Sequence, residues 1–131
     1  MAGTLQVELV AADRLVWSGT ASRVIARTTE GDVGILPGHA PILSVIIEGV
    51  VDVLTEDGET RVAAVDAGFL SVANNRVSIL SEHAEMSHEI DLEKARADLE
   101  RAKASGEKNL DVLGEEVRRA EARIRAVERA S

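Results

Sequence analysis

The 131-residue sequence has no cysteine and no tyrosine, and it contains one phenylalanine and one tryptophan. The lack of cysteine excludes disulfides, thiolate metal sites and cysteine nucleophiles. Because aromatic residues are scarce, a core must be built from the aliphatic residues that dominate the 45% apolar composition. No apolar stretch approaches the ~18 residues of a membrane span, and the start MAGTLQVELV lacks a signal-peptide pattern. We therefore expect a soluble cytoplasmic protein.

Positive charge is also in short supply, since the formal net charge is −8. This charge, together with the shortage of stacking aromatics, argues against a nucleic-acid partner, which would require clustered Lys and Arg. The charge is uneven, however. Residues 117–131 carry five arginines and two glutamates, whereas residues 1–89 carry five basic and 13 acidic side chains. An acidic body with a basic end suggests that this end meets an acidic partner.

The first 88 residues have the pattern of short strands. LQVELV alternates apolar and polar side chains, as a half-buried strand does, and further apolar runs follow every 8–12 residues. The runs are separated by dipeptides typical of hairpins: Glu48-Gly49, Asp57-Gly58, Ala67-Gly68 and Asn74-Asn75. There is no helical interval for crossovers. Residues 1–88 are therefore predicted to form an antiparallel β-sandwich of about ten short strands.

Residues 89–131 change to a helical composition rich in alanine and charge. Asp91 is a suitable N-cap, and Ser105-Gly106 interrupts the helical pattern. Two apolar stripes at alternating spacings of three and four flank this interruption: Leu92, Ala95, Leu99 and Ala102, then Leu110, Leu113, Val117, Ala120, Ile124 and Val127. We predict an antiparallel two-helix hairpin. Because its stripes are thin, we expect the hairpin to be only weakly held and able to detach or redock.

The segment Gly31–Ser44, GDVGILPGHAPILS, holds three of the glycines and both prolines of the chain. Glycine adopts backbone angles that other residues avoid and proline fixes φ, so this segment is predicted to be a shaped, rigid loop carrying His39. The segment has no nucleophile-elbow or metal-ligand spacing around His39. His39 is thus a candidate partner-contact residue or a structural loop residue. No acid–base pair is evident, and we interpret the chain as a non-enzyme without a metal site.

The same segment closely resembles the signature GE(I/L)GILPGHAPLL of the ε subunit of F-type ATP synthases, with Asp32 in place of the usual Glu. The resemblance extends over the opening VELVAADRLVWSG, the AGFLSVANNRVSIL region and the helical C-terminus. It implies a ten-stranded sandwich followed by two helices. It further implies a non-catalytic rotor subunit that binds the γ stalk and the membrane c-ring at the cytoplasmic face of the bacterial plasma membrane. Membrane attachment would come only through the complex.

In the family, the acidic residue and the histidine of this loop face the c-ring, and they match Asp32 and His39 here. The alternative for Asp32 is a turn carboxylate that caps its own backbone. The resemblance also implies that the C-terminal hairpin reaches the catalytic α/β subunits transiently and restrains ATP hydrolysis. The candidate contacts are the arginines of the basic end: Arg118, Arg119, Arg123, Arg125 and Arg129. The alternative is that these arginines are solvated or paired along the helix.

Some bacterial family members bind ATP on the folded hairpin through a motif I/L-D-x-x-R-A. Here the motif is matched by Ile90, Asp91 and Ala95, with Lys94 in place of Arg; Glu85 and Arg101 fall at further ligand-contacting positions. Lysine neutralises phosphate but lacks the bidentate fork of arginine. No cofactor is required, and ATP is expected at most as a weak regulatory ligand. Alternatively, Asp91 only caps the helix, and Lys94 and Arg101 are solvated.

The sequence thus predicts a rotor-stalk subunit with a sandwich over residues 1–88 and a regulatory hairpin over residues 89–131. The main alternative is an independent ligand-binding or homodimerising β-sandwich module. A third is a hydrolytic dyad of His39 and Asp32, which would require a pocket with a further polar group.

Overall fold

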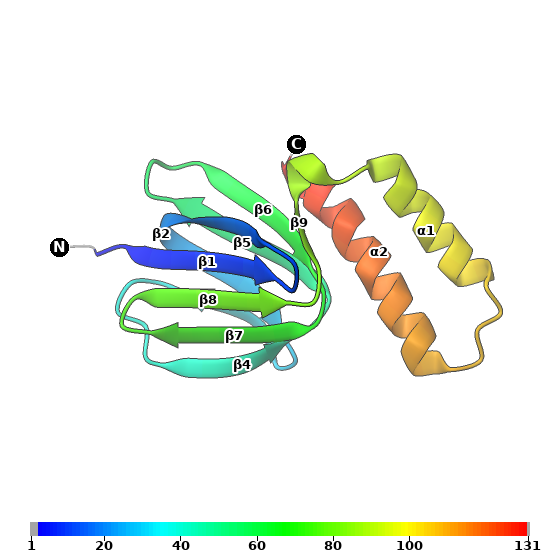
Figure 1. Cartoon of the computed structure of the whole chain (residues 1–131), viewed down its shortest axis with the longest axis horizontal. Coiled ribbons are helices and arrows are strands. Elements are labelled where there is room, and N and C mark those ends of the chain that lie inside the picture. Colours follow the sequence, from blue (N-terminus) through cyan, green and yellow to red (C-terminus); the bar gives the residue numbers. More distant parts are fainter. Residues whose placement is uncertain (1–2, 131) are drawn as a thin grey trace.

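A computed structural model describes residues 3–130. Within this range the chain forms nine strands followed by two α-helices (Figure 1). The strands are β1 (Leu5–Ala11), β2 (Leu15–Thr28), β3 (Gly31–Ile35), β4 (Ile42–Ile46), β5 (Gly49–Thr55), β6 (Thr60–Val65), β7 (Gly68–Ala73), β8 (Arg76–Ser81) and β9 (Ala84–Met86). A short 3₁₀ turn, η1 (Ser87–Glu89), leads to α1 (Leu92–Ala104) and α2 (Leu110–Ala130). The predicted fold class, a β-sandwich followed by a helical hairpin, is confirmed.

The strands follow the order β1-β8-β7-β4-β2-β5-β6-β9, with β3 paired to β2. Figure 1 shows β1, β8, β7 and β4 side by side in one layer. The 14-residue β2 pairs with β1 through its first half and with β3 and β5 through its second half, and its register with β5 shifts between Ala21 and Arg23. Among the described residues, all strand pairings but one are antiparallel; the exception is β1 with β8. The long β2 therefore connects the two layers of the sandwich.

The core between the layers is aliphatic, as the composition requires. Its largest fully buried side chains include Leu5, Ile35, Ile46, Leu70 and Ile79. They come from alternate positions of their strands, so the period of two in the sequence produces the buried face. The tight turn between β7 and β8 is made by Asn74 and Asn75, both with positive φ, as the hairpin dipeptide predicts.

Helix α1 begins and ends where the sequence indicates. The Asp91 carboxylate accepts a hydrogen bond from the Lys94 backbone N–H at 3.1 Å and caps α1. After α1, Gly106 adopts a φ of 72°, which ends the helix. The prediction that Leu110 joins the buried stripe is wrong, because its side chain is 78% exposed. It is the first residue of α2, and Figure 1 shows this end of α2 extending beyond α1.

The helix that docks against the sandwich is α2. Its Ala122 and Ala126 are buried against Val62 and Ala64 of β6. Small alanine side chains allow the helix backbone to approach the sheet closely. None of the helices in residues 3–130 is long and apolar enough to cross a membrane.

Candidate functional site

The outer face of β4, β7 and β8 carries an exposed apolar row. Val45 pairs with Phe69 across β4 and β7, and Phe69 pairs with Leu80 across β7 and β8. Phe69 and Leu80 are 52% and 51% exposed. A surface cavity of about 480 Å³ adjoins these three side chains. We call this row of Val45, Phe69 and Leu80 the apolar face. A continuous exposed apolar surface of this kind marks a contact site for another macromolecule.

One glycine shapes this face. A Cβ on Gly68 would lie 1.8 Å from the Leu80 carbonyl oxygen, so the strands can approach here only because the residue has no side chain. Our sequence interpretation missed the apolar face. The signal was present in the runs ILSVII and GFLSVA. In these runs apolar residues occupy both odd and even positions, so both faces of the strand are apolar rather than one.

The loop after β3 is fixed from two directions. The His39 N–H donates to the Leu36 carbonyl at 3.1 Å, and the Gly38 N–H donates to Oδ1 of Asn75 at 2.7 Å. The half-buried His39 ring contacts the carbonyl oxygen of Ala40 through Nδ1 at 2.6 Å. The predicted extent of the loop is wrong, because residues 31–35 form β3 and residues 42–44 belong to β4. The loop itself spans residues 36–41, and it is held by its own backbone and by the neighbouring β7–β8 turn.

Asp32 does not join His39. It is the exposed second residue of β3, beside the turn from β2, whereas His39 lies beyond the other end of the strand. The two side chains do not form the dyad that a hydrolytic site would need. In residues 3–130, no group of three or more acidic, histidine or cysteine side chains could hold a metal ion.

Four of the five arginines of the basic end form ion pairs with carboxylates of the sandwich. Arg118 lies 2.8 Å from Glu48, Arg123 lies 2.7 Å from Glu85, and Arg129 contacts Asp52 through Nε at 2.8 Å and Nη2 at 2.7 Å. Arg119 Nε lies 3.1 Å from Asp66 Oδ2, in an ion pair without hydrogen-bond geometry. We call Arg118, Arg119, Arg123 and Arg129 the docking arginines.

Three of the carboxylates that pair with these arginines are almost completely buried, which is unusual for acidic side chains. The side chains of Glu48, Asp52 and Asp66 are 3%, 9% and 1% exposed. Although burial lowers the pKa of Arg123, its hydrogen bonds and ion pairs with Glu85 and Asp66 more than offset this and raise it. The acidic partner that the charge pattern suggested is thus present within the chain. Of the five predicted arginines, Arg125 is exposed and has no ion pair among those of residues 3–130.

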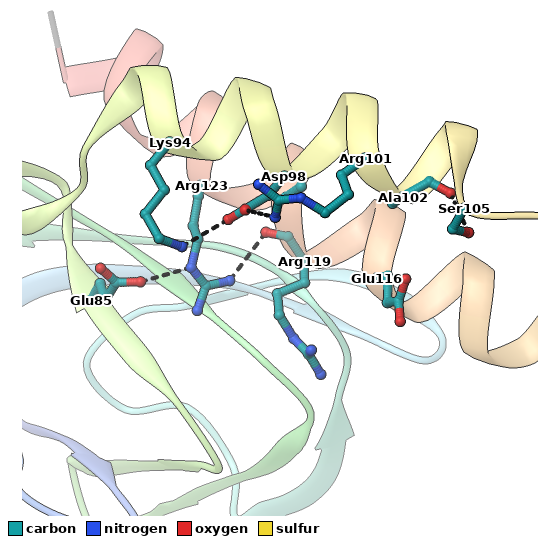
Figure 2. A pocket seen from close by; sticks show the side chains of 10 residues that line it. Glu85, Lys94, Asp98, Arg101, Ala102, Ser105, Glu116, Arg119 and Arg123 are labelled. Carbon is teal, nitrogen blue, oxygen red and sulfur yellow. Dashed lines mark hydrogen bonds and ion pairs between the residues drawn. The ribbon is translucent and has the colours of Figure 1, made fainter. Parts of the chain in front are cut away.

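A cavity of about 530 Å³ lies between α1, α2 and β9 (Figure 2). Its charged lining consists of Glu85, Lys94, Asp98, Arg101, Glu116, Arg119 and Arg123. Three residues predicted as ATP contacts, Glu85, Lys94 and Arg101, are therefore brought together. The other three do not line the cavity, since Asp91 caps α1, Ala95 is buried and Ile90 packs near Val62.

The cavity has the size of a small-molecule site, but its charges are already matched. Asp98 pairs with Lys94 and Arg101, Glu85 and Asp66 pair with Arg123, and Asp66 pairs with Arg119. A phosphate group entering the cavity would therefore compete with carboxylates for each of its four cations. The cavity is large enough for a nucleotide and is lined by basic residues that suit phosphate. These basic side chains are, however, already paired with carboxylates, so the fit to a nucleotide is poor.

Comparison with known proteins identifies what the chain resembles. Residues 4–87 match the family described as ATP synthase, Delta/Epsilon chain, beta-sandwich domain. The chain is 54% identical over 127 residues to the ATP synthase epsilon chain of Streptomyces avermitilis, covering 97% of this chain and 98% of that one. It is 49% identical over 127 residues to the epsilon chain of Rhodococcus jostii, covering 96% and 98%.

Solved structures share the architecture. A chain of the Euglena gracilis mitochondrial ATP synthase, in an assembly of OSCP, F1 and c-ring, superposes with a TM-score of 0.77. It is 25% identical, and the match covers 97% of this chain and 81% of that one. A chain from the central stalk and c-ring of the Tetrahymena thermophila enzyme gives a TM-score of 0.55 at 18% identity over 98% and 97% of the two chains, which bears on the fold alone.

Proposed function

The chain belongs to the family of ATP synthase delta/epsilon chains, and from this premise we propose that it works as a non-catalytic subunit of the central stalk of an F-type ATP synthase. In this role it couples proton flow to ATP synthesis without carrying out chemistry. Its partners are the γ subunit and the c-ring, and it reaches the cytoplasmic face of the bacterial plasma membrane only through the complex. The exposed apolar face of the sandwich is the observation that carries this proposal.

We assign the apolar face to the γ subunit. Its three side chains come from neighbouring strands of a rigid sheet, so they present a preformed surface that loses little conformational entropy on binding. The fixed loop with His39, and Asp32 near the start of β3, are the proposed contacts to the c-ring. Because β3 separates the two residues, we propose that they touch the ring at different points rather than as one site.

The test is binding of the purified γ subunit of the same synthase. We expect Phe69→Ser to weaken γ binding at least tenfold without changing the melting temperature, because the side chain is already half exposed. Leu110→Ser is the matched control, since Leu110 is an exposed apolar residue at the tip of the hairpin. Equal γ binding by Phe69→Ser and wild type would overturn the assignment. Self-association of the isolated chain that Phe69→Ser abolishes would favour the alternative of a homodimerising module.

The hairpin is proposed to act as a brake on ATP hydrolysis after it leaves the sandwich. Undocking would release the docking arginines from the sandwich carboxylates, and together with the already exposed Arg125 they could then meet acidic segments of the catalytic α/β subunits. In the docked state four of the five arginines are occupied by sandwich carboxylates. The ion pairs therefore support a two-state device in which docking and braking compete for the same side chains.

This competition predicts opposite effects for two changes in the reconstituted synthase. Ending the chain at Ile90 removes the brake, so ATP hydrolysis should become faster. Glu48→Gln weakens docking while leaving every arginine in place, so hydrolysis should become slower than with the intact chain. If neither change alters the rate, the hairpin is a passive appendage.

A weak ATP site in the cavity between α1 and α2 is also proposed, with Glu85, Lys94 and Arg101 as its contacts and Ile90, Asp91 and Ala95 in supporting positions. The cavity exists only when the hairpin is folded against β9, so a ligand bound there would favour the docked state. Titration of the isolated chain with ATP, followed by its melting temperature, tests this site. A rise in melting temperature with ATP concentration supports it, and no change contradicts it.

A further inference from the structure

Asp98 lies between two cations of the cavity. Its Oδ2 is 3.0 Å from Nζ of Lys94, and its Oδ1 is 2.8 Å from Nη1 of Arg101. Figure 2 shows the Asp98 carboxylate flanked by these two side chains on the wall that α1 contributes. Each carboxylate oxygen therefore contacts one cation, which is the arrangement that two oxygens of a phosphate group would adopt.

We propose that Asp98 is an internal occupant of the anion site formed by Lys94 and Arg101, and that it weakens the binding of phosphate-bearing ligands in the cavity by competing for both cations. This inference deepens the ATP site proposed above, on which it rests, by naming the residue that sets its affinity. The ligand class is a di- or triphosphate, because the paired cations suit several phosphate oxygens and the cavity of about 530 Å³ has room for a nucleotide.

The position of Asp98 on α1 makes this competition effective. It lies four residues after Lys94 and three before Arg101, so all three side chains share one face of the helix. Even when its ion pairs open, the carboxylate stays on the helix face that carries both cations. A phosphate bound to Lys94 and Arg101 would thus lie against a like charge, which strongly opposes binding.

Asp98 also remains ionised over the physiological range. The hydrogen bond from Lys94 is the main cause that lowers its pKa, and the hydrogen bond from Arg101 adds to it, while partial burial acts in the opposite direction. Ordinary changes of pH therefore do not open the site.

The other cations of the cavity do not offer an alternative anion site. Arg123 and Arg119 are held by Asp66 and, for Arg123, by Glu85, and these pairs join α2 to the sandwich. Releasing them would weaken the docking of the hairpin. Glu116 lines the end of the cavity near Ser105 and adds further negative charge there (Figure 2). Lys94 and Arg101 are thus the two cations that a single substitution can make available.

The experiment is calorimetric titration of the full chain with ATP and, separately, with inorganic pyrophosphate. Asp98→Asn keeps the shape of the side chain and removes its charge, and exposed pairs of this kind contribute little to stability. We expect Asp98→Asn to bind both ligands at least tenfold more tightly than wild type, and its melting temperature to rise on adding either ligand. Asp98→Ala serves as a second variant if the amide supplies new hydrogen bonds.

Two controls make the result specific. Glu100→Gln removes one negative charge from an exposed position of the same helix that does not line the cavity, and it should leave affinity unchanged. Adding Lys94→Ala to Asp98→Asn should abolish the gain. A gain that survives Lys94→Ala would overturn the inference, because the anion would then bind elsewhere.

The remaining outcomes separate the inference from the proposals it rests on. Equal, measurable affinity in wild type and Asp98→Asn would overturn the role of Asp98 and leave the ATP site standing. No binding by either protein would overturn both. Neither result would affect the assignment as a stalk subunit, which is tested by γ binding.

Discussion

Arg123 of α2 donates a hydrogen bond from Nη1 to Oδ1 of Asp66 at 3.2 Å and so joins the hairpin to the sandwich across 57 positions of sequence. Asp66 is itself fixed from the sandwich side, because its backbone N–H donates to Ser81 Oγ and to the His83 carbonyl, both at 3.0 Å. The Asp66 backbone is therefore held to the sandwich and does not follow the helix when the hairpin moves. Undocking must break this pair and leave Asp66 in need of a new partner.

The first prediction concerns this pair. Removing Arg123 leaves the buried Asp66 in its ion pair with Arg119 but without its charge-assisted hydrogen bond, which costs about 2 kcal/mol. We expect Arg123→Ala to weaken the docking of α2 by about this amount, seen as faster amide hydrogen exchange throughout α2 in the isolated chain. Arg125→Ala is the control, because this exposed arginine lies only two positions away and does not contact Asp66. Equal exchange in the two variants would show that apolar packing alone holds the hairpin.

This pair also marks a limit of prediction from sequence. Helix α1 and its cap were predictable because Asp91 and Gly106 act on their neighbours in the chain. The docking of α2 was not, since its contacts join residues 38 to 77 positions apart and the face is made of alanine and arginine rather than a long aliphatic stripe. Of the apolar stripe of α2, Ala120 is buried and lines the cavity together with Ala102 of α1. The hydrophobic pattern of α2 therefore identifies its apolar face. It misses the second face of the helix, which is bound to the sandwich mainly through ion pairs.

The sandwich shows the same division. Its strands and turns were predictable because alternation and Asn or Gly dipeptides are local signals. The apolar face was missed because Phe69 and Leu80 are apolar residues on the outside, where alternation predicts polar ones. Apolar side chains on the outer face of a strand, in addition to those on its core face, therefore indicate a surface that is buried only by a binding partner.

The second prediction concerns the close approach of β7 and β8. We expect Gly68→Ala to destabilise the chain by about 3 kcal/mol, since its Cβ would collide with the Leu80 backbone, which cannot move as a side chain would. Gly34→Ala is the matched control, because Gly34 lies in β3, does not have a positive φ and has no atom within 4 Å of the added Cβ. Urea unfolding of both variants measures the difference. Similar midpoints would mean that the strands separate without cost.

The third prediction concerns the segment that links the sandwich to α1. Arg14, from the β1–β2 turn, lies 3.0 Å from Glu89, whose Oε1 also accepts the Met86 N–H at 3.0 Å. The hydrogen bond from Arg14 is the main cause that lowers the pKa of Glu89 below its ordinary value of 4.5. A carboxylate with a lowered pKa in the folded state stabilises that state above the ordinary value and loses this contribution as the pH falls through the lowered one.

Acidification below about pH 4.5 should therefore loosen η1, and Glu89→Gln should reproduce that state at neutral pH. The measurement is amide exchange at Met86 and Ile90 as a function of pH, corrected for the intrinsic exchange rate. We expect protection to fall with pH in wild type and to be low and independent of this titration in Glu89→Gln. Parallel profiles for the two proteins would show that another group controls the linker.

The last prediction tests how the His39 loop is held. Asn75 serves two purposes, because its φ of 61° completes the β7–β8 turn and its side chain accepts the hydrogen bond from Gly38. Asn75→Ala loses both, so we expect a loss of about 2 kcal/mol, roughly half from the hydrogen bond and half from the left-handed backbone. Asn75→Gly retains the backbone freedom and should lose only about 1 kcal/mol, whereas Asn75→Asp keeps the acceptor and should stay close to wild type. Exchange of the Gly38 amide distinguishes the causes: it should accelerate in the Ala and Gly variants but not in the Asp variant. If all three variants protect Gly38 equally, the proline-rich loop is rigid by itself, and c-ring contact through His39 would not depend on the neighbouring turn.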